Sequence, residues 1–383
     1  MTVPRLQSKL PEVGTTIFTV MSQLAVQHGA VNLGQGFPDF DCDPRLQALV
    51  SKAMRAGHNQ YALMPGVTAL LEAIAEKTQR LYGHQYHPER EITVTAGATQ
   101  AIMAAILACV HPGDEVIALE PCYDSYIPGV RLAGGVPVLV QLDPGDYAVP
   151  WDKVRAAMTP RTRLILLNSP HNPSGAVFSA ADLDMLESIV KGTGVLLLAD
   201  EVYEHIIFDG LAHQSLSRRP VLAERAFVIS SFGKTFHATG WKIGYCCAPR
   251  ELTEELRKVH QFMVFAVSSA IQHGIASYLA DPTPYETLSA FYQAKRDHFR
   301  AGLAASRFKM LPCAGTFFQV VDYSGISDET EEQFARRLTV DHGVAAIPLS
   351  AFYTRPLDRK VVRFCFAKRE ETLDLALTRL ANL

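Results

Sequence analysis

The middle of the chain alternates apolar runs of strand length with segments that repeat apolar residues at helical spacing. The apolar runs lie at 91–95, 114–119, 137–142, 162–168, 195–200 and 226–229, and the helical patterns at about 67–82, 100–110 and 180–191. Runs such as 195–200 are apolar at consecutive rather than alternate positions, so both faces of these strands should be buried. This pattern predicts an α/β fold with a mainly parallel sheet covered by helices on both faces.

The two ends of the chain follow a different pattern. Near the N-terminus, Ile17, Phe18, Met21 and Leu24 recur at helical spacing. Near the C-terminus, a long helical pattern at about 284–306 is followed by strand patterns at 316–322 and 361–366, which predicts an α+β unit. A chain of 383 residues also exceeds one ordinary core. We therefore expect an N-terminal arm with part of a small domain (1–50), a large domain (51–283) and a C-terminal small domain (284–383).

Composition narrows the class of protein. Hydrophobic residues make up 48% and charged residues 20%, and the net charge of −3 gives no reason to expect a nucleic-acid partner. No apolar run reaches the length of a membrane span, and residues 1–10 lack the apolar core of a signal peptide. The seven cysteines include no CxxC pair, which favours a reducing compartment. We expect a cytoplasmic protein that does not bind membranes.

The stretch 230–245 carries the first chemical signal. Lys234 is flanked by small, aromatic and apolar residues, so a surface position fits it poorly. A buried lysine tends to lose its proton, and a neutral amine can form a Schiff base with a carbonyl. Enzymes that use pyridoxal 5'-phosphate (PLP) need such a lysine, a cation for the phosphate and an acid for the pyridine nitrogen. Lys242, eight residues further on, is a candidate for the cation.

Further candidates follow the predicted strands, at whose carboxyl ends ligands bind in open α/β sheets. Thr99 lies where a strand turns into a helix, and free N–H groups at a helix N-terminus suit a phosphate. Asp200 ends an apolar strand and could pair with a pyridine nitrogen, or serve as a helix cap or salt-bridge partner. Asn172 and Tyr203 could donate hydrogen bonds to a cofactor oxygen, or could be structural.

Three other motifs bear on the function. Arg363 lies inside the apolar run 361–366 and needs an anion, which could be a substrate carboxylate or a structural Asp or Glu. Gly34 and Gly36 could suggest a dinucleotide fingerprint, but Pro38 argues against the helix that this motif requires. Cys246 and Cys247 should point to opposite faces of a strand, and no HExxH pattern occurs, so we expect no metal site.

Taken in order, the motifs identify a family. They read NLGQGFPDF, NQYALMPG, TVTAGATQA, EPCYDSY, LNSPHNPSG, LADEVYEH, SSFGKTFHATGWKIGY and VVRFCFAK. Over nearly its whole length the chain resembles the class I/II aminotransferases, especially their methionine and kynurenine aminotransferase branch. The resemblance implies the α/β fold of the fold-type-I PLP transferases. Its large domain has a mainly parallel seven-stranded sheet between helices, and its smaller domain is α+β.

The resemblance also implies how the cofactor is held. Lys234 would form the internal aldimine with PLP and then move the proton, and Asp200 would bind the pyridine nitrogen. Asn172 and Tyr203 would bond the phenolic oxygen, and Tyr123 would stack on the ring. The residues expected around the phosphate are Ala98, Thr99, Ser231, Lys242 and, from the neighbouring subunit, Tyr61. Many family members have arginine where this chain has Lys242, which would still neutralise a phosphate as a point charge.

For the substrate, the resemblance implies a shared site in a homodimer. Arg363 and the backbone of Gly36, assisted by Asn172, would bind the amino acid carboxylate. Phe18 and the neighbouring subunit's Phe265 would line the side-chain pocket.

The expected activity is ping-pong transamination between methionine and a 2-oxo acid. Aromatic amino acids, histidine or kynurenine are further expected donors, because an apolar pocket discriminates only modestly between side chains. The alternative with the same cofactor is a cysteine-S-conjugate β-lyase. A non-enzymatic alternative, the PLP-binding domain of a transcription regulator, is disfavoured by the slightly acidic charge.

Overall fold

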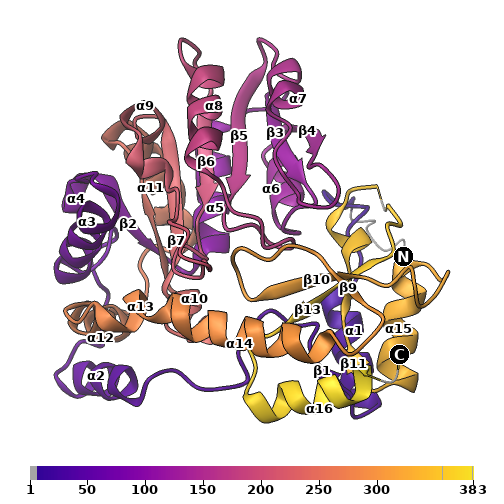
Figure 1. Ribbon diagram of the computed structural model, residues 1–383. Coiled ribbons are helices and arrows are strands. Elements are labelled where there is room, and N and C mark those ends of the chain that lie inside the picture. Colours follow the sequence, from indigo (N-terminus) through magenta and orange to yellow (C-terminus); the bar gives the residue numbers. More distant parts are fainter. Residues whose placement is uncertain (1–6, 356, 382) are drawn as a thin grey trace, which may run out of the picture.

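The computed structural model describes residues 7–355, 357–381 and 383 (Figure 1). Residues 1–6, which belong to the segment where we expect no signal peptide, lie outside the described residues. Within the part described, no helix is both long enough and apolar enough to cross a membrane.

The large sheet has seven strands in the order β2-β8-β7-β6-β5-β3-β4. Their bounds are β2 Ile92–Thr95, β3 Glu115–Glu120, β4 Val136–Gln141, β5 Thr162–Asn168, β6 Leu196–Asp200, β7 Ala226–Ser231 and β8 Gly244–Cys247. The pairs β3–β4, β3–β5, β5–β6 and β6–β7 are parallel, and only β8 runs antiparallel to its neighbours β2 and β7. The predicted, mainly parallel sheet is therefore confirmed.

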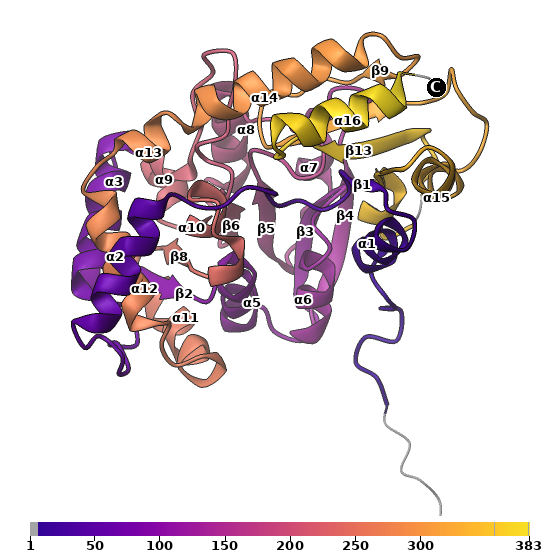
Figure 2. The ribbon, with the colours of Figure 1, turned by 90° about the horizontal axis from the view of Figure 1, so that it is seen from below.

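Helices cover both faces of this sheet (Figure 2). On one side lie α5 (Ala98–Cys109), α6 (Tyr126–Leu132) and α11 (Arg250–Met263), and on the other α7 (Trp151–Ala156), α8 (Ala180–Val190) and α9 (Pro220–Ala223). Neighbouring strand residues consequently enter different cores: Leu197 and Cys247 belong to one apolar cluster, Leu198 and Cys246 to the other. This burial on both faces explains the continuous apolar runs, and it separates the two adjacent cysteines as predicted.

A second, four-stranded sheet has the order β12-β13-β10-β9, with antiparallel pairing throughout. Its strands are β9 Lys309–Met310, β10 Phe318–Asp322, β12 Ile347–Pro348 and β13 Val361–Cys365. Around it lie α14 (Leu288–Leu303), α15 (Glu331–Asp341) and α16 (Glu370–Leu380) (Figure 1). The helical pattern at 284–306 forms two helices, α13 (Thr283–Glu286) and α14, rather than one.

The N-terminal segment contacts both parts of the molecule. Helix α1 (Ile17–Gln27) packs against α15, and β1 (Val31–Asn32) pairs in parallel with β11 (Val344–Ala345). Helix α2 (Pro44–Arg55) packs instead against α12 (Ser269–Leu279). The segment between them, 33–40, therefore crosses from one part to the other. The predicted domain boundaries at 50/51 and 283/284 stay a prediction.

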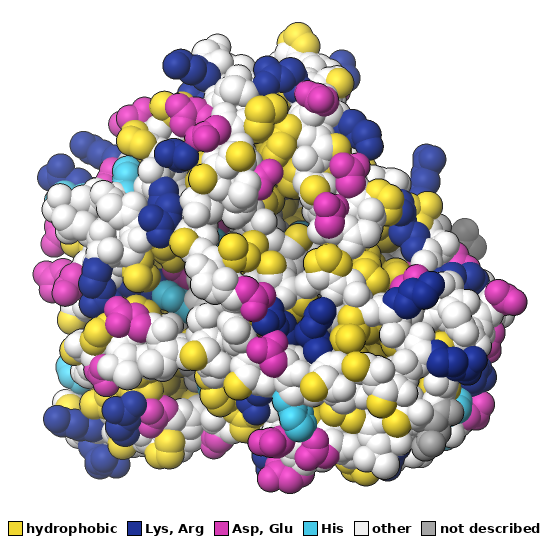
Figure 3. All heavy atoms as spheres, in the orientation of Figure 1, with side chains coloured by type: hydrophobic (Ala, Val, Ile, Leu, Met, Phe, Trp, Pro, Cys, Tyr) yellow, Lys and Arg dark blue, Asp and Glu magenta, His cyan; other side chains and the backbone are white. Residues whose placement is uncertain are grey.

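The long helix α3 (Thr68–Tyr82) and several short elements complete the fold. The short elements are α4 (Pro88–Glu91), α10 (Phe232–Thr235), η1 (Leu216–Arg218), η2 (Thr239–Trp241) and η3 (Leu349–Phe352). On the face shown in Figure 3, acidic and basic side chains are interspersed over the surface.

Candidate active site

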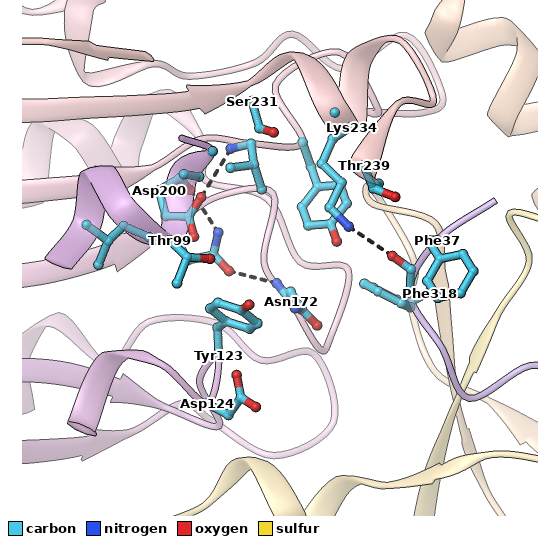
Figure 4. A pocket seen from close by; sticks show the side chains of 18 of the residues that line it. Phe37, Thr99, Tyr123, Asp124, Asn172, Asp200, Ser231, Lys234, Thr239 and Phe318 are labelled. Carbon is cyan, nitrogen blue, oxygen red and sulfur yellow. Dashed lines mark hydrogen bonds between the residues drawn. The ribbon is translucent and has the colours of Figure 1, made fainter. Parts of the chain in front are cut away.

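A cavity of about 350 Å³ lies where the carboxyl ends of β5 and β6 meet β10 and β13. Every predicted site residue except Tyr61 and Phe265 lines it: Phe18, Gly36, Ala98, Thr99, Tyr123, Asn172, Asp200, Tyr203, Ser231, Lys234, Lys242 and Arg363. In Figure 4, Lys234 and Asp200 reach into this space from different elements, with Tyr123 and Asn172 beside it. The volume lies within the range of small-molecule sites.

Lys234 enters the cavity from the short helix α10, directly after β7. Its Nζ donates a hydrogen bond to the carbonyl oxygen of Gly36 at 2.9 Å, and it lies 5.5 Å from the ring centroid of Tyr203. Burial is the main reason why the pKa of Lys234 falls to about 8, and the positive charges of Arg363 and Lys242 act in the same direction. An amine with such a pKa can act as a base or a nucleophile near neutral pH.

Asp200 ends β6, where the strand gives way to a turn. Its Oδ2 accepts a hydrogen bond from the Tyr126 hydroxyl at 2.6 Å, and its Oδ1 accepts one from the Val202 N–H at 3.3 Å. Burial raises the pKa of Asp200 to about 6, although both hydrogen bonds favour the ionised form. The carboxylate can therefore serve as the partner of a protonated ring nitrogen.

Asn168, at the end of β5, connects Asp200 to Asn172. The Asn168 amide donates to the backbone carbonyl of Asp200 at 2.8 Å, and its Oδ1 accepts from the Asn172 N–H at 2.8 Å. In the adjacent turn, Nδ1 of buried His171 lies 2.6 Å from Ser174 Oγ, and its Nε2 lies 2.9 Å from the carbonyl oxygen of Pro121. Since Pro121 precedes Tyr123 by two residues, these bonds hold the turns that carry Tyr123 and Asn172 together.

The N-terminus of α5 provides an anion site. Gly97 has a φ of +79°, no described side chain caps the helix, and Gly97, Ala98 and Thr99 line the cavity, so uncapped N–H groups lie at its edge. A Cβ at Gly97 would lie 3.3 Å from Lys242 Nζ, and one at Gly244 would lie 3.0 Å from the Ala98 nitrogen. Small residues at both positions thus bring a lysine and the helix end together.

Arg363 is buried, and its neighbours do not neutralise it. Its Nη1 donates to Asn172 Oδ1 at 2.7 Å, and its Nη2 donates to the Gly34 carbonyl at 3.1 Å. Among the described residues, Arg363 forms no ion pair with an Asp or Glu, and its buried Nε has no hydrogen-bond partner. Burial lowers the pKa of Arg363 to about 10. The structural salt bridge that the sequence left open is therefore not found, and the guanidinium can receive an anion.

Aromatic rings surround this arginine. The guanidinium carbon of Arg363 lies 3.8 Å from the ring centroid of Phe318, 4.9 Å from that of Phe352 and 5.5 Å from that of Phe18. Phe318 also packs against Gly36, because a Cβ at this glycine would lie 2.7 Å from its ring. The rings form an apolar wall next to a carboxylate-binding group.

Two predicted site residues lie away from this cavity. Tyr61 is 85% exposed and Phe265 is 43% exposed, and their ring centroids are 5.3 Å apart in an edge-to-face arrangement. Both residues were expected to act from the neighbouring subunit, which the single chain does not test. Near the site, His237 is partly buried against Phe40 and Tyr292.

Sequence reasoning did not assign a role to several residues of the site region, among them Tyr126, Asn168, Phe318 and Asp124. Asn168 had a signal in the sequence, because it is a polar residue that ends an apolar run, as Asp200 does. The structure pairs the two residues in register. Within the described part of the chain, no cluster of three or more His, Cys, Asp or Glu residues could hold a metal ion.

Comparisons with known proteins identify the family. Residues 29–380 match the family model described as "Aminotransferase class I and II". The chain is 50% identical over 378 residues to the methionine aminotransferase of Escherichia coli, with 98% of each chain covered. A crystal structure of an Escherichia coli protein whose reactivity identified a methionine aminotransferase function superposes with a TM-score of 0.98, at 50% identity and with both chains fully covered.

Two further relatives are more distant. The structure of N-succinyldiaminopimelate aminotransferase from Mycobacterium tuberculosis has a TM-score of 0.95 at 42% identity, covering 99% of this chain and 100% of that one. A kynurenine–oxoglutarate transaminase of Dictyostelium discoideum is 34% identical, covering 97% of this chain and 94% of the relative. The chain therefore belongs to the class I and II aminotransferases.

Proposed function

We propose that this chain transfers the amino group of methionine to a 2-oxo acid with PLP as its cofactor. The observation that carries the proposal is the 50% identity and TM-score of 0.98 to methionine aminotransferase, combined with Lys234, Asp200 and Arg363 around one cavity. The kynurenine transaminase relative supports aromatic amino acids and kynurenine as further donors, with histidine as another candidate.

The residues around the cavity fit PLP. The α5 N-terminus with Ser231, Thr239 and Lys242 suits the phosphate, and glycines keep this cradle free of Cβ atoms. The buried amine of Lys234 suits the aldehyde, and the carboxylate of Asp200 suits the ring nitrogen. When bound, PLP supplies an aldehyde that accepts the amino group and a ring that withdraws electrons from the substrate Cα.

Each side chain around the cavity has a separate role in the reaction. With PLP bound, Lys234 would take the proton from the substrate Cα as a general base and return it as a general acid to the former aldehyde carbon of the cofactor. Asp200 would keep the proton on the ring nitrogen, and Asn172 and Tyr203 would donate hydrogen bonds to the ring oxygen. Tyr123 would cover one face of the ring. The same steps in reverse on a 2-oxo acid complete a ping-pong cycle.

Substrate recognition rests on one charge and an apolar wall. Arg363, whose Nε has no partner among the described residues, binds the amino acid carboxylate together with the Gly36 backbone. Phe18 and Phe318 face the side chain. Such a wall separates apolar side chains by only about 1–3 kcal/mol per methylene, so several amino acids should react.

We also propose a homodimer. Phe262, Phe265 and Tyr61 are exposed aromatic residues at the end of α11 and in the loop after α2, and Met54 and Leu63 extend the exposed apolar surface. A second copy packed on this surface would bring Tyr61 to the phosphate and Phe265 to the side-chain pocket. The division into a large and a small domain, and residence in the cytoplasm, belong to the same proposal. All seven cysteines are free thiols, which supports a reducing compartment.

The test is a titration of the PLP-loaded protein followed by its visible absorbance. Methionine, phenylalanine, tyrosine, histidine, aspartate and kynurenine are added one at a time, and then a 2-oxo acid. Methionine should change the cofactor band, and the oxo acid should restore it. A band that none of these amino acids changes would contradict the proposal.

The alternative of a cysteine-S-conjugate β-lyase is not favoured, because the relatives described above are aminotransferases. Pyruvate and ammonia formed from a cysteine conjugate without any oxo acid would identify that activity.

A further inference from the structure

Tyr126 has no role in the proposed function, although it contacts Asp200. It is the first residue of α6, and its side chain is 1% exposed. Its hydroxyl donates to Oδ2 of Asp200 at 2.6 Å, whereas the Val202 N–H reaches Oδ1 at 3.3 Å. Within the described residues, the phenol is therefore the closest hydrogen-bond donor to this carboxylate.

The position of Tyr126 shows that it can act only through another residue. Tyr126 does not line the cavity, whereas Asp200 and Tyr123 do. The Tyr126 N–H donates to the Tyr123 carbonyl at 3.1 Å, and the two rings lie edge to face at 5.7 Å. The same turn of the chain thus places the Tyr123 ring at the cavity and the Tyr126 hydroxyl on the Asp200 carboxylate, outside the cavity.

A phenol in this position affects where a shared proton resides. A hydrogen bond to the charged form of a carboxylate lowers its proton affinity, and here it opposes the effect of burial on Asp200. Hydrogen bonds to charged groups are also stronger than neutral ones, especially away from water. When Asp200 faces a ring nitrogen, a weaker base leaves the proton on the nitrogen, and a stronger base draws it to the carboxylate.

We propose that Tyr126 is a positioning residue that holds Asp200 oriented and ionised, so that the proton stays on the ring nitrogen of PLP. This inference rests on the proposed function, because it requires PLP to lie beside Asp200. Since a protonated ring withdraws electrons more strongly, Tyr126 contributes to the ease with which Lys234 removes the Cα proton.

The decisive test is ¹⁵N NMR of PLP labelled at its ring nitrogen and bound to the protein. The wild-type signal should be that of a protonated pyridine nitrogen. In Tyr126→Phe it should move toward the signal of the neutral form, and kcat for methionine should fall roughly tenfold or more, with less change in KM. A general loss of packing would not move the proton between the two atoms.

Tyr86→Phe is a matched control. Tyr86 is also 1% exposed, and its hydroxyl lies 3.0 Å from Ser217 Oγ, away from the cavity. This variant also loses a buried tyrosine hydroxyl and its hydrogen bond, here to a neutral partner, and its ¹⁵N signal should equal that of the wild type. If both variants shifted the signal equally, the specific link between Tyr126 and Asp200 would be refuted.

A second variant covers the case in which Tyr126→Phe does not fold or bind PLP. Replacing Tyr126 by 4-aminophenylalanine keeps the shape and leaves a weaker donor, so a partial shift is expected. A signal identical to the wild type in either variant overturns this inference and leaves the proposed function intact. A wild-type protein that does not bind PLP, or that holds its nitrogen unprotonated, contradicts the assignment of Asp200 itself.

Discussion

The carbonyl oxygen of Gly36 accepts a hydrogen bond from Nζ of Lys234 at 2.9 Å, across 198 positions of sequence. The loop after β1 thus provides the hydrogen-bond acceptor for the amine of a lysine that follows β7. This single neutral acceptor does not offset the loss of water around the amine, and the pKa of Lys234 is lowered to about 8. The reactivity of the lysine and the folding of the N-terminal segment are linked through this contact.

Lys234→Met should stabilise the cofactor-free protein at pH 7. Between pH 8 and the ordinary lysine value of 10.5, the unfolded chain binds a proton that the folded chain does not, so wild-type stability rises with pH in that window. Below pH 8, burying the charged amine lowers the free energy of unfolding of the wild type by its full amount, which is about 3 kcal/mol at most. In urea unfolding, the free energy of unfolding of the variant should exceed that of the wild type by about 1–3 kcal/mol at pH 7 and by less at pH 10.5. An advantage that does not change with pH would contradict the lowered pKa.

Lys234→Ala and Lys242→Ala should have different effects, although each removes one cation from the cavity. Loss of Lys234 removes the acid and base that moves the proton, so kcat for methionine should fall by at least about 10²–10⁴-fold. Loss of Lys242 should mainly raise the dissociation constant of PLP, and saturating PLP should restore much of the activity. Near-wild-type turnover by Lys234→Ala would refute its assigned role.

Arg363→Gln should weaken substrates that carry a carboxylate while PLP remains bound. Truncating one partner of a buried charged contact costs about 2–5 kcal/mol, so kcat/KM for methionine should fall by roughly 30-fold or more. The matched comparison is 3-(methylthio)propylamine, which lacks the carboxylate and should react equally slowly with both proteins. Loss of PLP from the variant would indicate a structural role for Arg363 instead.

Phe262→Glu should weaken the proposed homodimer. This residue is 87% exposed at the end of α11, in the apolar surface that we assign to the second copy. Val26→Glu is the control, because Val26 is 84% exposed on α1 and outside that surface. Sedimentation equilibrium should find a dimer for the wild type and for Val26→Glu, and a larger monomer fraction for Phe262→Glu. Equal dimer fractions in all three proteins would exclude this surface as the interface.

His237→Phe should make the protein less sensitive to acid. Burial, together with the charge of Lys295, lowers the pKa of His237 to about 4, and its buried Nε2 lacks a partner among the described residues. As pH falls from 6.5 to 4, the unfolded chain takes up a proton that the folded chain resists, so the wild type loses stability. Denaturant unfolding measures the free energy of unfolding at pH 7.5 and at pH 4.5. Its decrease between these two pH values should be smaller by about 1–2 kcal/mol in the variant than in the wild type. Equal losses would show that His237 does not titrate in this way.

The sequence predicted the sheet and most of the cavity for a common physical reason. Asp200 and the turn that contains Asn172 follow continuous apolar strands, and parallel strands deliver their carboxyl ends to one edge. The position of Lys234 away from the surface was predicted from its apolar and small flanking residues. Two-residue strands such as β1 and β11 are too short to leave a periodic signal. Their pairing also joins residues more than 300 positions apart.

The remaining site residues depend on side-chain directions that only the fold determines. Tyr126 could have pointed into the cavity with Tyr123, but the start of α6 turns it behind Asp200 instead. Phe318 resembles any buried strand aromatic until β10 pairs with β13 and places it over Arg363. The contributions expected from Tyr61 and Phe265 stay predictions, since they require a second chain.

The segment 33–40 has one further consequence. On its outer side, Lys368 holds the carbonyl of Phe37 at 2.8 Å, and Asp39 accepts the Arg369 N–H at 2.6 Å. On its inner side, the Gly36 carbonyl accepts a hydrogen bond from Lys234, which lies in α10 directly after β7 of the large sheet. The segment therefore fixes a distance: a change in the separation of the two sheets alters the reach between Gly36 and the amine of Lys234.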